Sequence, residues 1–387
     1  MSRRWIVLLL LVTCCTATPS QPAAGTSSSP SVAALPSPSV SAKPSASSTP
    51  LLVALEAEGT SDATQWNTIA IAGMDGFAKA KATFTPMPRP YVGCAGAVLP
   101  QSAYAVSAKA YYADGAGVIR SLAPGGQPIQ VTSFPLTSTQ QMLSFAVSPD
   151  EGHLLATVFT LPPKPASATD PCTSGAPPFG SGTFAEDVYG ANAGGASHLL
   201  YHQDLGQFGG PNQQRVMSFI GWDAVGPLAT FPTGWATQGG GPVHYWGTPV
   251  RVDPTTGTVV KPVSDQLCQV WDIAASGDYL CVDSDGRIWV RRSAGSEIWH
   301  LPPSVTGYGY DLLSPDEAHF ADMSGLVFNS DGSTVPLPNG FSYSGWLDSK
   351  TLISGDVSKN LSYVNLGAPA TVVDIGFKGV FVGTVRS

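Results

Sequence analysis

The sequence is poor in charge, and the charge that it has is dispersed. Only 12% of its 387 residues are Asp, Glu, Lys or Arg, and the acidic excess gives a formal net charge of −8. A coiled coil or long-helix protein would need far more Glu and Lys. Binding to a phosphate backbone relies on clustered cations, and the densest basic site is the pair Arg291-Arg292. The composition therefore excludes a long-helix protein and argues against nucleic acid as a partner.

Long apolar runs and helical periodicity are also missing. No run reaches the roughly 20 apolar residues of a transmembrane helix, and no stretch shows a sustained 3.6-residue stripe. By contrast, the chain has 42 Gly, 34 Pro, 9 Trp, 12 Tyr and 15 Phe. Collagen would need a strict Gly period, and a wholly disordered chain would lack the aromatic residues. What remains is an all-β, Gly-rich protein of strands and turns, long enough to bury a large core.

Residues 1–15 are typical of a secretory signal peptide. Arg3 and Arg4 precede a short apolar run, which ends at Thr13 and the cysteine pair Cys14-Cys15. The residues 11–14, Leu-Val-Thr-Cys, resemble the lipobox of bacterial lipoproteins. This resemblance implies lipid attachment at Cys14, or at Cys15 if the motif is shifted by one residue. A plain signal peptide that is cleaved near Ala17 is the alternative.

Residues 16–50 are almost wholly Ser, Pro, Ala and Thr. Such a composition cannot bury enough apolar surface to offset its chain entropy, and frequent Pro favours extended polyproline II geometry. At about 3.1 Å per residue the segment could reach on the order of 100 Å. We expect a disordered tether that holds a folded domain, residues 51–387, off a membrane surface.

The folded region repeats a pattern of apolar runs and tight polar turns. The run Phe145–His153 contains Ser-Pro-Asp-Glu before its His, and the run Leu313–His319 repeats this motif. Further Gly/Asp/Asn turns separate β-branched and aromatic runs, which favours antiparallel strands. Three turns in each unit give four strands, the content of a propeller blade. We count seven units, centred on residues 51–86, 94–135, 142–205, 215–264, 267–302, 308–338 and 341–375.

The last apolar run, residues 379–385, follows a completed seventh unit. It is expected to supply the inner strand of the first blade and to close the ring non-covalently, which removes exposed sheet edges. The Ser-Pro-Asp turns resemble the WD40-like repeats of TolB-type β-propellers. This resemblance implies a propeller architecture and an envelope-assembly role, but the motif shapes a turn and carries no chemistry. Tandem β-sandwiches are the structural alternative.

Four cysteines follow the signal region, an even number in a chain expected to be exported. Cys268 and Cys281 flank a tight turn, so we expect them to face each other across adjacent strands and to form a disulfide. Cys94 and Cys172 would then form the second disulfide, between two Gly/Pro-rich loops. Four buried, reduced thiols are the alternative.

No catalytic or cofactor motif is recognisable in the sequence. His153 and His319 occupy matching repeat positions and are interpreted as structural. His198, His202 and the nearby Asp204 could conceivably hold a metal, but we assign no metal site. The residues 283–286, Asp-Ser-Asp-Gly, look like part of a calcium loop, yet a hairpin turn explains them better.

Two insertions stand out, residues 162–183 and 234–248. By the strand count, both join the second and third strands of neighbouring blades, so they emerge on the same face. Binding residues commonly lie on such loops. The second insertion contains the candidate ligand-binding residues Trp235, His244, Tyr245 and Trp246, which could form an aromatic platform for a sugar, peptide or protein. A self-packed lid over the central channel is the alternative.

These observations predict a monomeric, non-enzymatic binding or envelope-assembly module. It would lie on the extracytoplasmic face of the bacterial membrane, held there by its lipid anchor alone. Its partner would be an envelope protein or a cell-wall ligand. An extracytoplasmic hydrolase or lyase on a propeller scaffold is the alternative, and it would need convergent Asp, Glu or His side chains at the channel mouth.

Overall fold

The chain divides into two units, Met1–Ala46 and Ser47–Ser387. The computed structural model describes residues 49–56, 66–87, 90, 102–163, 182–207, 217–230, 249–264, 268–302, 312–322, 324–355 and 360–386, all within the second unit. These residues form 28 strands and contain no helix. The signal and lipid-attachment predictions lie outside the described residues, and so do Cys94, Cys172 and the predicted tether, except for its last two residues, 49 and 50; Pro50 belongs to the first blade and not to a tether.

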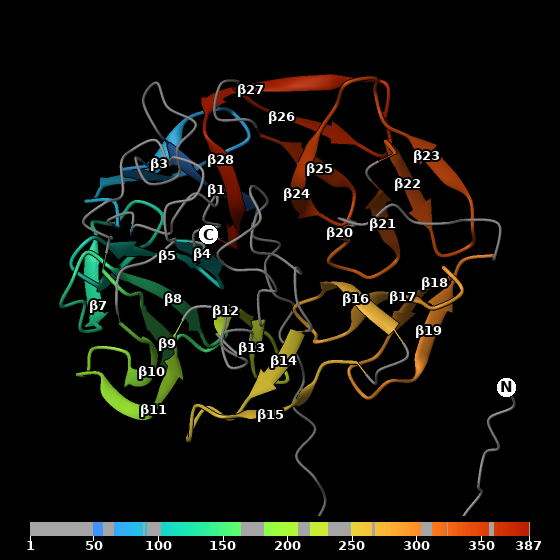
Figure 1. Cartoon of the computed structure of the whole chain (residues 1–387). Helices are drawn as coiled ribbons and strands as arrows, with labels where there is room; N and C mark the ends of the chain where they lie inside the picture. Colours follow the sequence, from blue (N-terminus) through green and yellow to red (C-terminus); the bar gives the residue numbers. More distant parts are fainter. Residues whose placement is uncertain are drawn as a thin grey trace, which may run out of the picture. The chain divides into compact units, whose positions relative to one another are not determined.

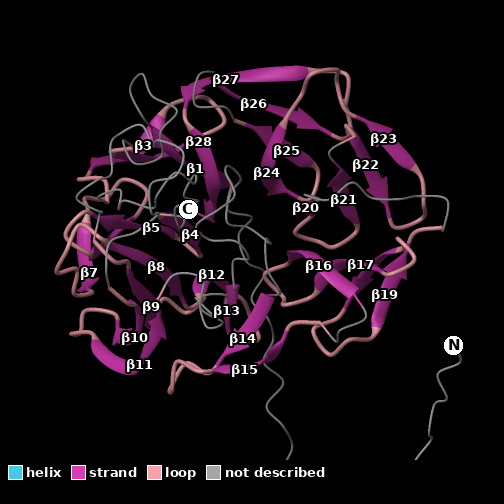
Figure 2. Cartoon of the chain, viewed as in Figure 1, coloured by secondary structure: helices cyan, strands magenta, loops and turns pink. Residues whose placement is uncertain are grey.

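The strands form seven antiparallel four-stranded sheets, the blades of a β-propeller (Figures 1 and 2). Blade 1 consists of β28 (Val380–Arg386), β1 (Pro50–Glu56), β2 (Thr68–Ala72) and β3 (Ala78–Thr83). Blade 2 consists of β4 (Ala103–Val106), β5 (Lys109–Asp114), β6 (Val118–Leu122) and β7 (Ile129–Ser133). Blade 3 consists of β8 (Gln141–Val147), β9 (His153–Thr160), β10 (Phe184–Asn192) and β11 (His198–Gly206). Blade 4 consists of β12 (Ser218–Trp222), β13 (Pro227–Thr230), β14 (Pro249–Val252) and β15 (Val259–Pro262).

Blade 5 consists of β16 (Cys268–Ile273), β17 (Tyr279–Asp283), β18 (Ile288–Arg291) and β19 (Glu297–His300). Blade 6 consists of β20 (Leu312–Leu313), β21 (His319–Asp322), β22 (Leu326–Asn329) and β23 (Thr334–Pro336). Blade 7 consists of β24 (Tyr343–Asp348), β25 (Thr351–Ser354), β26 (Asn360–Asn365) and β27 (Val372–Lys378). Each predicted unit corresponds to one blade, so the expectation of seven four-stranded blades is confirmed and the sandwich alternative is wrong.

The hydrophobic core lies between the blades. Each of seven clusters of buried side chains draws on two neighbouring blades, and together they run from blade 1 through blade 7 and back to blade 1. A blade that packs on both faces needs apolar residues at successive positions, and all seven residues of β8 are buried. The ring is therefore held by face-to-face packing of adjacent sheets.

The C-terminal strand closes the ring without a covalent bond. β28 pairs antiparallel with β1, from Pro50 opposite Arg386 to Leu55 opposite Val380. Val385 is fully buried in the cluster between blades 1 and 2. The predicted closure by the last run is thus confirmed, and it leaves β1 paired on both sides.

The two Ser-Pro-Asp-Glu turns are built alike. Ser148 Oγ donates to Asp150 and accepts from the backbone N–H of His153. Ser314, Asp316 and His319 repeat both bonds. The following glutamates have φ of +61° and +62°, which lets each turn reverse within four residues. Sequence similarity between the turns therefore reflects a shared hydrogen-bond pattern.

The antiparallel order defines two faces of the ring. We call the face at Pro50 and Arg386 the entry face. The turns between first and second strands lie there, because Arg386 N donates to Ser107 O, Ser107 Oγ to Pro149 O, and Ala224 N to Ala275 O. The opposite face, where second strands end and third strands begin, is called the loop face.

Candidate functional site

The four aromatic and histidine candidates, Trp235, His244, Tyr245 and Trp246, lie outside the described residues. The strands that flank them are described. β13 ends at Thr230 and β14 begins at Pro249, while the other insertion separates β9 from β10. Both insertions thus join second to third strands in blades 3 and 4, as expected, and both leave from the loop face. The aromatic platform itself stays a prediction.

Beneath these loops, side chains of blade 3 bond to the innermost strand of blade 4. Glu186 Oε1 accepts the Met217 N–H at 2.7 Å, and Ser144 Oγ accepts the Phe219 N–H at 2.9 Å. Ser144 Oγ also lies 2.6 Å from Thr157 Oγ1. β12 has a ladder partner only in β13, so these acceptors satisfy donors that the ladder leaves unpaired. The seam between blades 3 and 4 is therefore held by side-chain bonds as well as packing.

Glu186 is the titratable member of this seam. It is 2% exposed, and burial raises the pKa of its carboxyl to about 8, although the Met217 N–H acts in the opposite direction. The group is consequently protonated at neutral pH. The sequence analysis missed it. The available signal was the alternation along the strand. Phe184, Glu186 and Val188 lie two residues apart and so share one strand face, and both Phe184 and Val188 are buried.

The described innermost strands, which surround the centre of the ring in Figure 1, carry few charges. These are Asp272 in β16, Asp348 at the end of β24 and Arg386 at the end of β28. Asp272 accepts the backbone N–H of Leu313 at 2.7 Å, a bond from blade 5 to blade 6. No convergent set of Asp, Glu or His side chains, which the enzyme alternative needs, lies on these seven strands.

The histidines have local partners. His202 Nδ1 lies 2.6 Å from Asp187 Oδ1, and its Nε2 lies 3.7 Å from Asp204. The bond to Asp187 raises the pKa of His202. Within the described ranges, no group of three or more His, Cys, Asp or Glu side chains could hold a metal ion. His153 and His319 each pair through Nδ1 with an asparagine of the third strand, in accord with a structural role.

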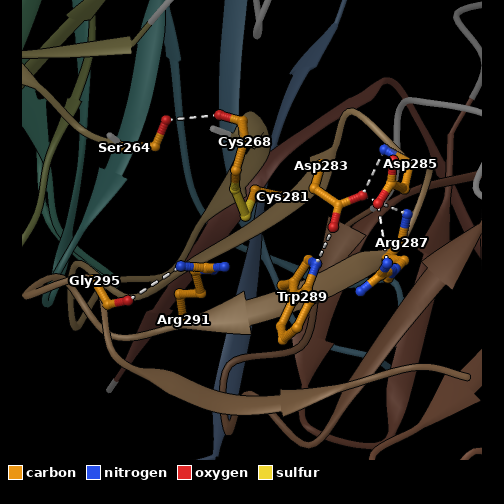
Figure 3. The surroundings of a disulfide bond; sticks show 9 residues. All are labelled: Ser264, Cys268, Cys281, Asp283, Asp285, Arg287, Trp289, Arg291 and Gly295. Atoms are coloured by element: carbon orange, nitrogen blue, oxygen red, sulfur yellow. Dashed lines mark hydrogen bonds and ion pairs between the residues drawn. A yellow bond between two sulfur atoms is a disulfide. The ribbon is translucent and has the colours of Figure 1, made fainter. Parts of the chain in front are cut away.

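The predicted disulfide joins Cys268 to Cys281 with a Cα–Cα distance of 5.6 Å (Figure 3). The register differs from the expectation, because Cys281 lies opposite Val270 and the bridge is diagonal across β16 and β17. Beside it, Trp289 donates to Asp283, which lies in the predicted hairpin turn, and Arg291 covers the Trp289 ring. Both cysteines are buried, so this bridge reinforces blade 5.

A buried ion pair lies in the entry face. Arg251 Nη1 lies 2.5 Å from Asp223 Oδ1, and the two side chains are 8% and 4% exposed. Asp223 also accepts the backbone N–H groups of Val225 and Gly226, while Arg251 reaches the carbonyl of Gly277 in blade 5. These contacts link the first turns of blades 4 and 5 and point to a structural role.

Comparison with known proteins identifies no family. No family model matches, and no curated protein matches. Three similar solved structures are the C-terminal WD40 domain of Sif2, a putative TolB from Agrobacterium tumefaciens and an oligogalacturonate lyase from Vibrio parahaemolyticus. Their identities are 12%, 12% and 11%, and their TM-scores are 0.38, 0.33 and 0.41. The matches cover 76%, 85% and 84% of this chain, and 88%, 89% and 91% of those chains.

Proposed function

We propose that this protein is a membrane-tethered, extracytoplasmic β-propeller that acts as a non-enzymatic binding or envelope-assembly module for a protein or cell-wall ligand. One observation carries the proposal. The N-terminal segment joins the ring at Pro50 on the entry face, whereas both insertions leave blades 3 and 4 at the loop face. A tether attached to the entry face leaves the loop face free to meet a partner.

Two further features support this proposal. The seam beneath the loops is a buried hydrogen-bonded framework, so it offers the rigid base on which binding loops are commonly built. The Cys268–Cys281 disulfide suits an oxidising compartment outside the cytoplasm. The aromatic residues of the second insertion supply amphipathic rings of the kind that anchor protein and sugar ligands.

The experiment compares the parent chain with a Trp235→Ala, Trp246→Ala double variant. Purified cell-wall sacculi and detergent-solubilised envelope serve as probes in a capture assay. We expect capture to fall at least about tenfold, because interface aromatics commonly contribute more than 1 kcal/mol each. The melting temperature should stay within about 2 °C, since surface changes away from the core cost little.

The matched control is Val225→Ala, which shortens an exposed apolar side chain on the entry face. It should capture both probes as the parent does. Unchanged capture by the double variant would exclude these two residues as the binding platform. Turnover of polysaccharide or peptide by the parent chain would instead favour the hydrolase or lyase alternative.

A further inference from the structure

The large hydrophobic side chains that remain exposed among the described residues all lie at the entry face. They are Phe77, Ile129, Leu199, Val225, Val259, Val260, Val372 and Val373. Two of them lie in turns at this face, between β2 and β3 and between β12 and β13. The other six are the first or second residues of the outermost strands β7, β11, β15 and β27, which begin there. In the described part of the chain, the exposed large apolar side chains thus share one side of the ring.

These positions follow one another around consecutive blades. In blades 1 to 4 the turn between the third and fourth strands touches the preceding blade: Gly125 N donates to Lys79 O at 2.9 Å, and Gly194 N to Val131 O at 2.8 Å. Gly76 packs against the carbonyl of Ile375, and Gly257 packs against Val188. Blades 7, 1, 2, 3 and 4 are linked in this way. We call their exposed residues, without Val225, the apolar belt.

Charge along the belt is sparse, with two lysines, three aspartates and one histidine. Residues 73–79, 123–130, 193–199, 253–261 and 366–374 contain the basic or titratable side chains Lys79, His198 and Lys261 and the acidic side chains Asp75, Asp253 and Asp374. Lys79 and Asp75 pair at 3.2 Å. Such a surface does not need an anionic partner. A partner would bind to it mainly through the burial of apolar side chains.

The position of the belt indicates what covers it. The 48 residues that precede the described chain join the ring at this face, in blade 1, which lies within the arc that carries the belt. We propose that the apolar belt docks on a lipid bilayer, with its Val, Leu, Ile and Phe side chains in the boundary between headgroups and acyl chains. Exposed contiguous apolar patches mark such interaction surfaces, and shallow insertion is the usual mode of peripheral attachment. The orientation rests on the proposed tethering, but the lipid contact does not require acylation, and it replaces the expectation that an extended tether holds the ring off the membrane.

The test uses the full chain with Cys14→Ala and Cys15→Ala, so that acylation cannot cause binding. Phosphatidylcholine vesicles are the probe in a co-sedimentation assay. A second form adds four serines, one in each of blades 1 to 4: Phe77→Ser, Ile129→Ser, Leu199→Ser and Val260→Ser. We expect the first form to partition into the vesicle pellet and the serine form to lose at least about tenfold of that partition, because each side chain loses its apolar burial.

Two controls separate the lipid contact from other causes. Trp235→Ala with Trp246→Ala, on the loop face, should leave vesicle binding unchanged. Raising NaCl from about 0.1 to 0.5 M should also leave it unchanged, because the few charges along the belt offer little to screen. Circular dichroism and the melting temperature check that the serine form is folded, which the exposure of all four residues favours.

Absent partition of the first form, or equal partition of the serine form, would overturn the proposal. Concentration-dependent self-association that the four serines abolish would also overturn it, and would identify a second copy as the occupant. Failure of the proposed binding function is distinguishable, since it would alter capture by the loop face and leave vesicle partition intact.

Discussion

Replacing Glu186 by Gln should make the protein more stable at neutral and alkaline pH. The carboxyl is buried between blades 3 and 4, and burial raises its pKa from 4.5 to about 8. Between these two values the folded protein retains a proton that the unfolded chain has lost. The unfolded state then binds fewer protons, so the stability contributed by this group falls as pH rises from about 4.5 to about 8 and is constant above that.

The size of the effect follows from the same shift. One pKa unit corresponds to 1.36 kcal/mol, so the group contributes at most about 5 kcal/mol of destabilisation above pH 8. A glutamine can keep the acceptor for the Met217 N–H and carries no charge. We therefore expect Glu186→Gln to match the parent at pH 4.5 and to exceed it by at least about 1 kcal/mol at pH 9.

Guanidinium titrations at pH 4.5, 6, 8 and 9 measure this difference. Asp204→Asn is the control, because Asp204 lies on the same blade with its side chain 77% exposed. It should show no comparable gain at high pH. A difference between the Gln variant and the parent that stays constant from pH 4.5 to 9 would refute burial as the cause of the protonation.

Three further predictions concern the ring and its seams. Cys268→Ser with Cys281→Ser should lower the unfolding free energy by roughly 3 kcal/mol, measured by denaturant titration; an unchanged midpoint would argue against a constraint by the disulfide. Deleting residues 380–386 should leave one edge of β1 unpaired and cause self-association in size-exclusion chromatography, whereas a stable monomer would contradict the closure. Arg251→Met should cost about 3–5 kcal/mol and the added Asp223→Asn should recover part of it; equal stability of both variants would exclude an uncompensated buried charge as the cause.

The sequence was sufficient to predict the blade architecture because each blade is specified locally. The Ser148 and Ser314 turns contain their own hydrogen-bond partners within five residues, so the motif is legible without the fold. The same holds for the closing strand, whose apolar run had no partner left in blade 7. The disulfide was predictable as a pairing but not in register, because the hairpin pairs Ile273 with Tyr279 and its ladder therefore places Asp283, and not Cys281, opposite Cys268.

Contacts between blades were not predictable in this way. Glu186 was overlooked because its partner Met217 is 31 residues away, across an insertion and in another blade. The Asp223–Arg251 pair likewise depends on which side chains two antiparallel strands and the next blade enclose. Only the burial of Glu186, Asp223 and Arg251 shows that these three side chains matter.

By itself, the sequence determined the all-β class, the number of blades and the positions of the two long insertions, since turns and strand periodicity depend on residues close together in the chain. The shared face of the two insertions also followed from the strand count, but only the tertiary structure decided that Pro50 and the exposed apolar side chains lie on the opposite face. The side of the ring that holds Pro50, the loops on the other side and the apolar belt follow from the order of antiparallel strands around a closed ring. That order relates residues hundreds of positions apart, and no local pattern encodes it.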